Sequence, residues 1–277
     1  MQFPKVLVLG ATGRIGAILR RCWPQDGPRW QSRAPQGGPG WCVLDPLGDP
    51  AALARAARGC DAVLCLAGGV PGRGRLADNA PLARAAVRAG AETGARVLLA
   101  SSAAVYGAAG GVLREDAVPV PVSEYGAAKV AMERRGAALA AELGVPVTAL
   151  RIGNVAGVDA ILGGWRPGFR LDRFGDGRTP RRSYVGPATL ARVLGDLLAV
   201  PDLPGVLNIA VPGVVEMGAL LAAADLGWTP RTPDDSAIPE VRLCTETLQR
   251  FTAFTPAEST AAEMVAQWRA LEAMETG

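Results

Sequence analysis

The stretch Val6-Leu7-Val8-Leu9-Gly10-Ala11-Thr12-Gly13-Arg14-Ile15-Gly16 decides the fold of this 277-residue chain. An apolar run is followed by three glycines at fixed offsets and then by residues that read at helical period. Glycines in such a position permit a tight turn and let the backbone approach a pyrophosphate at a helix N-terminus. The spacing alone is weak, because a chain of this glycine content should contain it by chance about 0.5 times. Its place between an apolar run and a helical pattern predicts a dinucleotide-binding turn, with a plain strand-helix turn as the alternative.

Further apolar runs follow the first one and alternate with Ala/Leu/Arg segments of helical period. The expected strands are 6–9, 41–44, 62–66, 97–100 and 147–152. The expected helices with clear boundaries are 49–59, 123–144, 188–199, 216–225 and 259–275. Continuously apolar strands suit a parallel sheet that is buried on both faces. We therefore predict an α/β fold: a Rossmann-type doubly wound parallel sheet at 1–152 that binds the cofactor, and a smaller substrate-binding lobe at 153–277. The lobes are expected to pack as one unit and to exchange some segments.

The composition excludes several classes of protein. A hydrophobic fraction of 49% with 20% charged residues describes a compact globular chain, and a net charge of +3 is too small to imply nucleic acid. No segment is apolar for long enough to span a membrane. The chain has no histidine, which removes the commonest general base and every imidazole metal site. Catalysis would depend on Tyr, Lys, carboxylate or Cys, and we expect no metal.

The cysteines indicate a reducing compartment. They are five in number, an odd count without CxxC spacing, at Cys22, Cys42, Cys60, Cys65 and Cys244. The sequence Met-Gln-Phe-Pro-Lys leads directly into the first apolar run, so we expect no signal peptide. Both features favour the cytoplasm.

The choice between NAD and NADP depends on the residues that follow the second strand. We place these residues at 29–33, Arg-Trp-Gln-Ser-Arg. An acid there binds the ribose 2′-hydroxyl, whereas an arginine accommodates a 2′-phosphate. The segment contains no acid, and Ser32 and Arg33 would donate to a phosphate. We therefore expect NADP rather than NAD; a solvated loop arginine is the alternative. Asp45, after the third strand, would either bind the adenine edge or stabilise a turn before Pro46.

Tyr125 and Lys129 form the most specific pattern. The chain has three tyrosines and two lysines, so this spacing should arise by chance only about 0.02 times. Residues four apart share a helix face, so the ammonium can lie beside the phenol and lower its pKa. Upstream, Ser101 and Ser102 end a strand at the edge where ligands bind in open α/β sheets. The alternative is a surface helix with an exposed Tyr and Lys.

At this point the chain resembles the extended short-chain dehydrogenase/reductase family, the NAD(P)-dependent epimerase/dehydratase group. The matching motifs are Gly10-x-x-Gly13-x-x-Gly16, Ser102-Ala-Ala-Val-Tyr106-Gly107, Tyr125-x-x-x-Lys129 and Leu150-Arg-Ile-Gly-Asn154-Val. Later landmarks resemble the family in order: Gly175-Asp-Gly177, Arg182-Ser-Tyr-Val and Asn208-Ile-Ala. The resemblance therefore covers nearly the whole chain.

The resemblance implies roles for individual residues. Ser102 would be the catalytic hydroxyl, Tyr125 the acid/base and Lys129 its partner, which also binds the cofactor. Tyr106 would be structural. Ser102, Tyr125, Asn154 and Arg182 would contact the substrate. The cofactor-binding residues are expected to be Gly10, Thr12, Gly13, Arg14, Ile15, Gly16, Ser32, Arg33, Asp45, Ala67, Gly68 and Lys129.

Three departures from the family pattern bear on function. Dehydratases of the family carry Asp-Glu after the catalytic hydroxyl, but here Ala103 and Ala104 follow it, and methyl groups cannot transfer protons. Ala188 and Thr189 replace the paired acids after the Arg-x-Phe/Tyr-Val landmark, which affects only local capping. The C-terminal lobe is also short for a nucleotide sugar. Arg182 argues the other way, because it resembles the arginine that contacts a substrate diphosphate, although a solvated arginine is an equal alternative.

The leading hypothesis is an NAD(P)-dependent oxidoreductase that transfers a hydride between nicotinamide and a carbonyl or secondary alcohol of a sugar-like or other polar small molecule. The alternative is a nucleotide-sugar 4-epimerase with tightly bound NAD. A third, weaker hypothesis is a non-catalytic nucleotide-binding sensor. The sequence leaves a homodimer open and does not identify the substrate.

Overall fold

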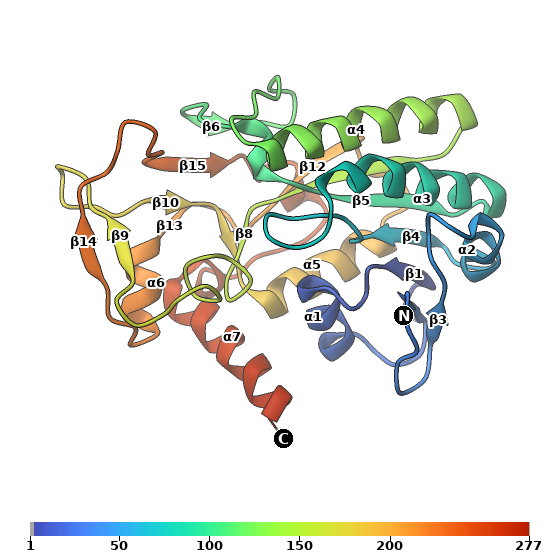
Figure 1. Ribbon diagram of the computed structural model, residues 1–277, viewed down its shortest axis with the longest axis horizontal. Coiled ribbons are helices and arrows are strands. Elements are labelled where there is room, and N and C mark those ends of the chain that lie inside the picture. Colours follow the sequence, from blue (N-terminus) through green and yellow to red (C-terminus); the bar gives the residue numbers. More distant parts are fainter. Residues whose placement is uncertain (1–2, 277) are drawn as a thin grey trace. The chain divides into compact units, whose positions relative to one another are not determined.

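The computed structural model describes residues 3–276 (Figure 1). The chain divides into two compact units. The first contains the chain up to Gly107 together with Pro119–Arg151 and Val193–Leu207. The second contains Ala108–Val118, Ile152–Arg192 and the chain from Asn208 onward.

A seven-stranded sheet forms the centre of the first unit. Its order is β12-β7-β5-β4-β1-β2-β3, and the pairs from β3 to β5 are parallel. The strands are β1 (Val6–Leu9), β2 (Pro28–Ser32), β3 (Trp41–Val43), β4 (Ala62–Cys65), β5 (Arg96–Ser102), β7 (Val147–Ile152) and β12 (Val206–Ile209). The chain order reverses between β1 and β4, which is the switch point of a doubly wound sheet. The predicted Rossmann-type α/β fold is confirmed.

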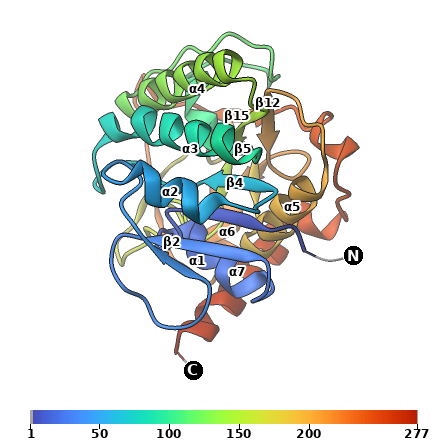
Figure 2. The same ribbon diagram turned by 90° about the vertical axis from the view of Figure 1, so that its right-hand side faces the viewer.

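Helices cover both faces of this sheet (Figure 2). On one face lie α2 (Pro50–Ala57), α3 (Asn79–Thr93) and α4 (Glu124–Leu143), and on the other lie α1 (Arg14–Cys22) and the later part of α5 (Pro187–Ala199). Capping residues occur at three of the predicted helix ends. The Asp49 carboxylate accepts from the Ala52 N–H, the Ser123 hydroxyl accepts from the Gly126 N–H, and Gly144 ends α4 at φ +68°.

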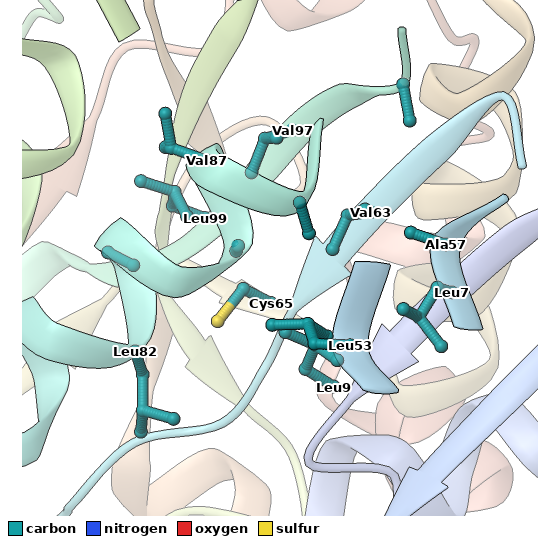
Figure 3. Packing of buried hydrophobic residues seen from close by; sticks show 14 of the residues in the cluster. Leu7, Leu9, Leu53, Ala57, Val63, Cys65, Leu82, Val87, Val97 and Leu99 are labelled. Carbon is teal, nitrogen blue, oxygen red and sulfur yellow. The ribbon is translucent and has the colours of Figure 1, made fainter. Parts of the chain in front are cut away.

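The main apolar core lies between the sheet and the α2–α4 face. Figure 3 shows side chains from β1 and β4, such as Leu7, Leu9 and Val63, packed with Leu53 of α2 and Val87 of α3. All four residues of β1 are 0% exposed, which explains why its sequence is continuously apolar. This core therefore fixes the position of β1, and the glycine loop follows directly on the end of that strand.

Some strands differ from the sequence-based expectation: β12 joins the main sheet from outside 1–152, and β2 lies later in the chain than expected. Residues 29–32 form β2 itself and do not follow it, so Ser32 is the last residue of a strand and Arg33 the first after it. The strand was missed because Pro-Arg-Trp-Gln-Ser lacks an apolar run: in place of aliphatic residues, Pro28, Trp30, Gln31 and Ser32 occupy the buried positions. Strand β5 also extends two residues further than expected and includes Ser101 and Ser102.

The second unit is built from short elements. A four-stranded sheet has the order β13-β10-β15-β6, formed by β6 (Val112–Leu113), β10 (Arg181–Arg182), β13 (Val215–Glu216) and β15 (Glu240–Leu243). Two smaller pairs are β8 (Asn154–Val155) with β11 (Tyr184–Val185), and β9 (Arg170–Asp172) with β14 (Thr229–Arg231). Its helices are α6 (Met217–Ala223) and α7 (Ala261–Thr276), together with the first residues of α5. Among residues 3–276 no helix has both the length and the apolar character needed to cross a membrane.

Candidate active site

The glycine loop joins β1 to α1, and its glycines are required by close backbone contacts. Gly10 has φ +77°, and a Cβ there would lie 2.7 Å from the backbone nitrogen of Ala67. A Cβ at Gly16 would overlap the carbonyl oxygen of Ala11. Gly13 is the N-cap of α1, so no N-cap side chain covers the first turn. This geometry is suited to a pyrophosphate at the helix start. Of the other loop residues assigned to the cofactor, Thr12 and Arg14 are exposed and Ile15 is half-buried.

Gln31 holds the glycine loop in place, a role that the sequence did not reveal. It is 3% exposed, its Oε1 accepts from the Gly10 N–H at 2.9 Å, and its Nε2 donates to the Leu44 carbonyl at 2.8 Å. A polar residue at a buried strand position was the available signal. Gln31 thereby ties the loop to the ends of β2 and β3.

The residues expected to choose between NAD and NADP lie at the end of β2. Ser32 is buried and its hydroxyl donates to the Ala34 carbonyl, whereas Arg33 is exposed. Asp45 is exposed, and its Oδ1 accepts from the Leu47 N–H at 3.1 Å. Asp45 therefore stabilises the turn that leads to α2, and its contact with adenine remains a prediction.

Asn79 lies close to the loop that follows β4 and was also missed from the sequence. Its Nδ2 donates to the carbonyls of Gly69 and Leu76, at 3.1 and 2.9 Å. Its Oδ1 is buried without a hydrogen-bond partner. A Cβ added to Gly68 would overlap that oxygen and would lie 3.6 Å from Lys129 Nζ. Two polar groups therefore converge on the side of Gly68 that a side chain would occupy, while Ala67 next to it is half-buried.

The structure brings Ser102, Tyr125 and Lys129 together, and we refer to them as the Ser-Tyr-Lys set. The Lys129 Nζ lies 5.8 Å from the centroid of the Tyr125 ring, and the Tyr125 hydroxyl is hydrogen-bonded to the Ser102 side chain. Lys129 is 5% exposed, and its ammonium donates to the Ala100 carbonyl at 2.7 Å. The 20-residue helix α4 positions both Tyr125 and Lys129, and the end of β5 positions Ser102.

Burial dominates the protonation of this set. It lowers the pKa of Lys129 from 10.5 to about 8, against the raising effect of the Cys65 and Glu133 charges. It also raises the pKa of Tyr125, opposed by the hydrogen bond with Ser102 and by the charge of Arg14. In the protein without nucleotide the pKa of Tyr125 is therefore raised overall and not lowered as expected, because desolvation of the phenolate is the larger effect.

The two remaining predicted substrate residues belong to the second unit. Asn154 begins β8, where its backbone pairs with β11 and its side chain is hydrogen-bonded to Tyr184. Arg182 on β10 is partly buried and donates to the Ile238 carbonyl at 2.9 Å. Within residues 3–276 the structure contains no group of acidic, Cys or His side chains able to hold a metal ion.

Comparison with known proteins identifies the family. The model of the NAD dependent epimerase/dehydratase family matches residues 6–163, which is more than half of the chain. The chain belongs to this family. The resemblance to extended short-chain dehydrogenases/reductases is thereby confirmed. The roles assigned to individual residues are not decided by a family match and stay predictions.

Individual relatives agree with this assignment. A UDP-glucose 4-epimerase of Azospirillum brasilense is 41% identical over 88 residues, a segment that is 31% of this chain and 24% of that protein. The match thus spans about a quarter of the curated relative. A solved structure, MoeE5 in complex with UDP-glucuronic acid and NAD, is 25% identical with a TM-score of 0.75, and the alignment covers 96% of this chain and 99% of that one. A short-chain dehydrogenase/reductase superfamily protein from Agrobacterium tumefaciens with bound NAD shares the fold at 20% identity, with a TM-score of 0.75 and 98% coverage of both chains.

Proposed function

We propose that this protein is an NAD(P)-dependent oxidoreductase of the short-chain dehydrogenase/reductase type. It would transfer a hydride between nicotinamide and a carbonyl or secondary alcohol carbon of a sugar-like molecule. The observation that carries this proposal is the buried Lys129 ammonium beside the Tyr125 phenol, which is itself hydrogen-bonded to Ser102. A buried ammonium next to a phenol is costly for a fold and useful for proton transfer.

The residues present fit a dinucleotide. Gly13 at the N-cap adds no side chain to the start of α1, and a Cβ at Gly10 or Gly16 would overlap the backbone of Ala67 or Ala11, so the loop needs glycine to keep this shape. The unpartnered Asn79 Oδ1 is an acceptor for a ribose hydroxyl, and the Lys129 ammonium has donors beyond the one that it gives to Ala100. These two groups would hold the nicotinamide ribose beside Gly68.

The chemistry divides between the cofactor and the chain. When bound, the nicotinamide would supply or accept the hydride. The Ser102 hydroxyl would orient the substrate oxygen, and the Tyr125 hydroxyl would donate its proton to that oxygen in reduction and recover it in oxidation. Lys129 would hold the ribose and favour the phenolate by its positive charge. Because the chain has no histidine, the phenol is the group placed to transfer this proton.

NADP is the nucleotide that we propose, on the basis of Arg33. The exposed Arg33 follows directly on β2, and residues 29–33 contain no acid to bind a ribose 2′-hydroxyl. The solved relatives contain NAD, which makes the preference a point for direct measurement.

The proposed substrate class is a nucleotide sugar or a related sugar acid. The named relatives are a UDP-glucose 4-epimerase and a protein solved with UDP-glucuronic acid. Arg182 and Asn154 are the side chains that we propose for substrate binding. The 4-epimerase is therefore the second candidate function. Ala103 and Ala104, in place of acidic residues, argue against dehydration.

We also propose which parts of the chain bind the two ligands, and its compartment. The segment 1–152 would bind the cofactor and 153–277 the substrate. The compartment would be the cytoplasm.

The test is a turnover assay on the full chain. Nucleotide sugars, sugar acids and simple ketones are offered with NADPH or NADH, and the oxidation of the nucleotide is followed. A reductase consumes the reduced nucleotide in step with product. An epimerase interconverts two sugars without added nucleotide and purifies with NAD bound. A protein that binds neither nucleotide would refute both functions.

A further inference from the structure

A buried ion pair lies directly behind the Ser-Tyr-Lys set. Arg151 of β7 donates to the Glu133 carboxylate of α4 through Nη2 to Oε2 at 2.9 Å and through Nε to Oε1 at 3.1 Å. The two side chains are 5% and 9% exposed. Strand β7 neighbours β5 in the sheet, so the pair connects the α4 face with the strand next to the one that carries Ser102.

The pair has further partners on both sides of Ser102. The hydroxyl of Ser101, the residue before it, donates to Glu133 Oε1. Arg151 Nη1 donates to the Tyr106 hydroxyl at 3.0 Å, and Tyr106 ends the short helix Ala103–Tyr106 that begins directly after Ser102. Ser102 therefore lies between two residues that are fixed by the same pair.

The same pair is connected to the other half of the set through α4. Tyr125, Lys129 and Glu133 follow one another at intervals of four residues, so they lie along one face of the helix. A shift of α4 against β5 would move the phenol and the ammonium relative to Ser102. The hydrogen bonds of Glu133 to Ser101 and Arg151 oppose that shift.

We propose that Glu133 and Arg151 are positioning residues: they fix α4 against β5 so that Ser102, Tyr125 and Lys129 keep their mutual geometry, and they hold the Glu133 carboxylate where it stabilises the charged Lys129 ammonium. This inference rests on the proposed function of that set. Stability alone gives little reason for such a pair, because apolar residues of similar volume often replace a buried ion pair without loss. The hydrogen bonds of this pair to residues on both sides of Ser102 give it a role in positioning instead.

Charge gives the proposal a readout that a purely structural pair would not affect. The titratable groups around Lys129 are Cys65 on β4 and Tyr125 and Glu133 on α4. Burial raises the pKa of Cys65 to about 11 and raises that of Tyr125, so both are neutral near pH 8. Glu133 is then the anion that helps Lys129 keep its proton.

The experiment measures the dissociation constant of NADH against pH from about 6.5 to 9.5 in the full chain, a range in which the phosphates of NADH do not titrate. In wild type we expect affinity to fall above about pH 8, as Lys129 loses the charge that strengthens its bond to the ribose, by about fivefold. Glu133→Gln should move the onset of this fall downward by about one pH unit, and Glu133→Asp, which keeps the charge, should restore it. An onset in Glu133→Gln that equals wild type overturns the proposal.

Controls separate this inference from the proposed function. Glu142→Gln makes the same change at an exposed site on α4 and should leave the onset in place. Lys129→Met should abolish the pH dependence; if it does not, Lys129 does not hold the ribose and the proposed function fails first. If Glu133→Gln does not fold, the double variant Glu133→Gln with Arg151→Gln removes both charges together. There the two charge effects on Lys129 oppose each other, so turnover is the readout: it should fall because the hydrogen bonds to Ser101 and Tyr106 are lost, and wild-type turnover counts equally against the proposal.

Discussion

Tyr125 and Lys129 should separate in their effects on turnover and binding. Tyr125→Phe removes the hydroxyl that transfers the substrate proton but no group proposed to touch nucleotide, so turnover should fall by about 10²–10⁴-fold with nucleotide affinity nearly unchanged. Lys129→Ala should impair both. Rates with the best substrate and dissociation constants from titration calorimetry check this. A Phe variant that keeps more than about a tenth of the rate would exclude the role of Tyr125.

Lys129 should also make stability depend on pH in a specific window. Burial lowers its pKa from 10.5 to about 8, so between these values the unfolded chain binds more protons than the folded one. Stability then rises with pH across this window, and the cost of burying the ammonium, fully present below pH 8, disappears above about 10.5. Lys129→Met lacks this cost. The stability advantage of Lys129→Met should therefore shrink by about 3 kcal/mol between pH 7 and pH 10, measured by denaturant unfolding without nucleotide. An advantage that is constant with pH would contradict the burial of a charged Lys129.

Gly16 tests the packing of α1 against the end of β1. A Cβ there would overlap the Ala11 carbonyl, which is backbone and cannot move aside cheaply. Gly16→Ala should therefore destabilise the protein by about 1–3 kcal/mol and weaken nucleotide binding. Gly37→Ala is the matched control, since no atom lies within 4 Å of its added Cβ. Equal unfolding midpoints for the two variants would show that the loop is looser than the structure indicates.

The ion pair between β7 and α4 should show the asymmetry of a buried charge pair. Arg151→Met leaves the Glu133 carboxylate buried without its guanidinium, at a cost of about 3–5 kcal/mol. The double variant Glu133→Leu with Arg151→Met leaves no unpaired charge, so it should recover most of that loss. Urea unfolding of the single and double variants measures this coupling. If the single variant unfolds at the wild-type midpoint, the carboxylate is not buried as described.

Nucleotide binding should stabilise the whole molecule. A ligand at a hundredfold excess over its dissociation constant adds about 2.7 kcal/mol to the free energy of unfolding, which is readily seen as a shift in melting temperature. We expect a larger shift with NADP than with NAD at equal concentration, and Arg33→Ala should reduce the NADP shift selectively. Equal shifts for the two nucleotides, or a larger one for NAD, would overturn the proposed preference.

The sequence by itself determined the features whose cause is local. The apolar strands at 6–9 and 147–152 were predicted to the residue, because strands buried on both faces are continuously apolar. The caps Asp49 and Ser123 were predicted because the side-chain oxygen of such a residue accepts a hydrogen bond from a backbone N–H in the first turn of the helix, three residues later. The spacing of Tyr125 and Lys129 was informative because residues four apart lie on the same face of a helix, which is also a local property.

Only the tertiary structure decided which distant polar groups meet. Asn79 reaches the loop at Gly68, Gln31 holds Gly10, and Glu133 pairs with Arg151. A buried polar group needs a hydrogen-bond partner, but the order of the strands and the packing of the helices determine which group that is. Neither can be predicted from the spacing of nearby residues. The pKa of Tyr125 follows the same rule: sequence supplied the neighbouring charge, but burial, which the whole fold sets, outweighs it. The membership of Ala108–Val118 in the second unit and of Val193–Leu207 in the first likewise depends on contacts between distant parts of the chain, which periodicity along the sequence does not reveal.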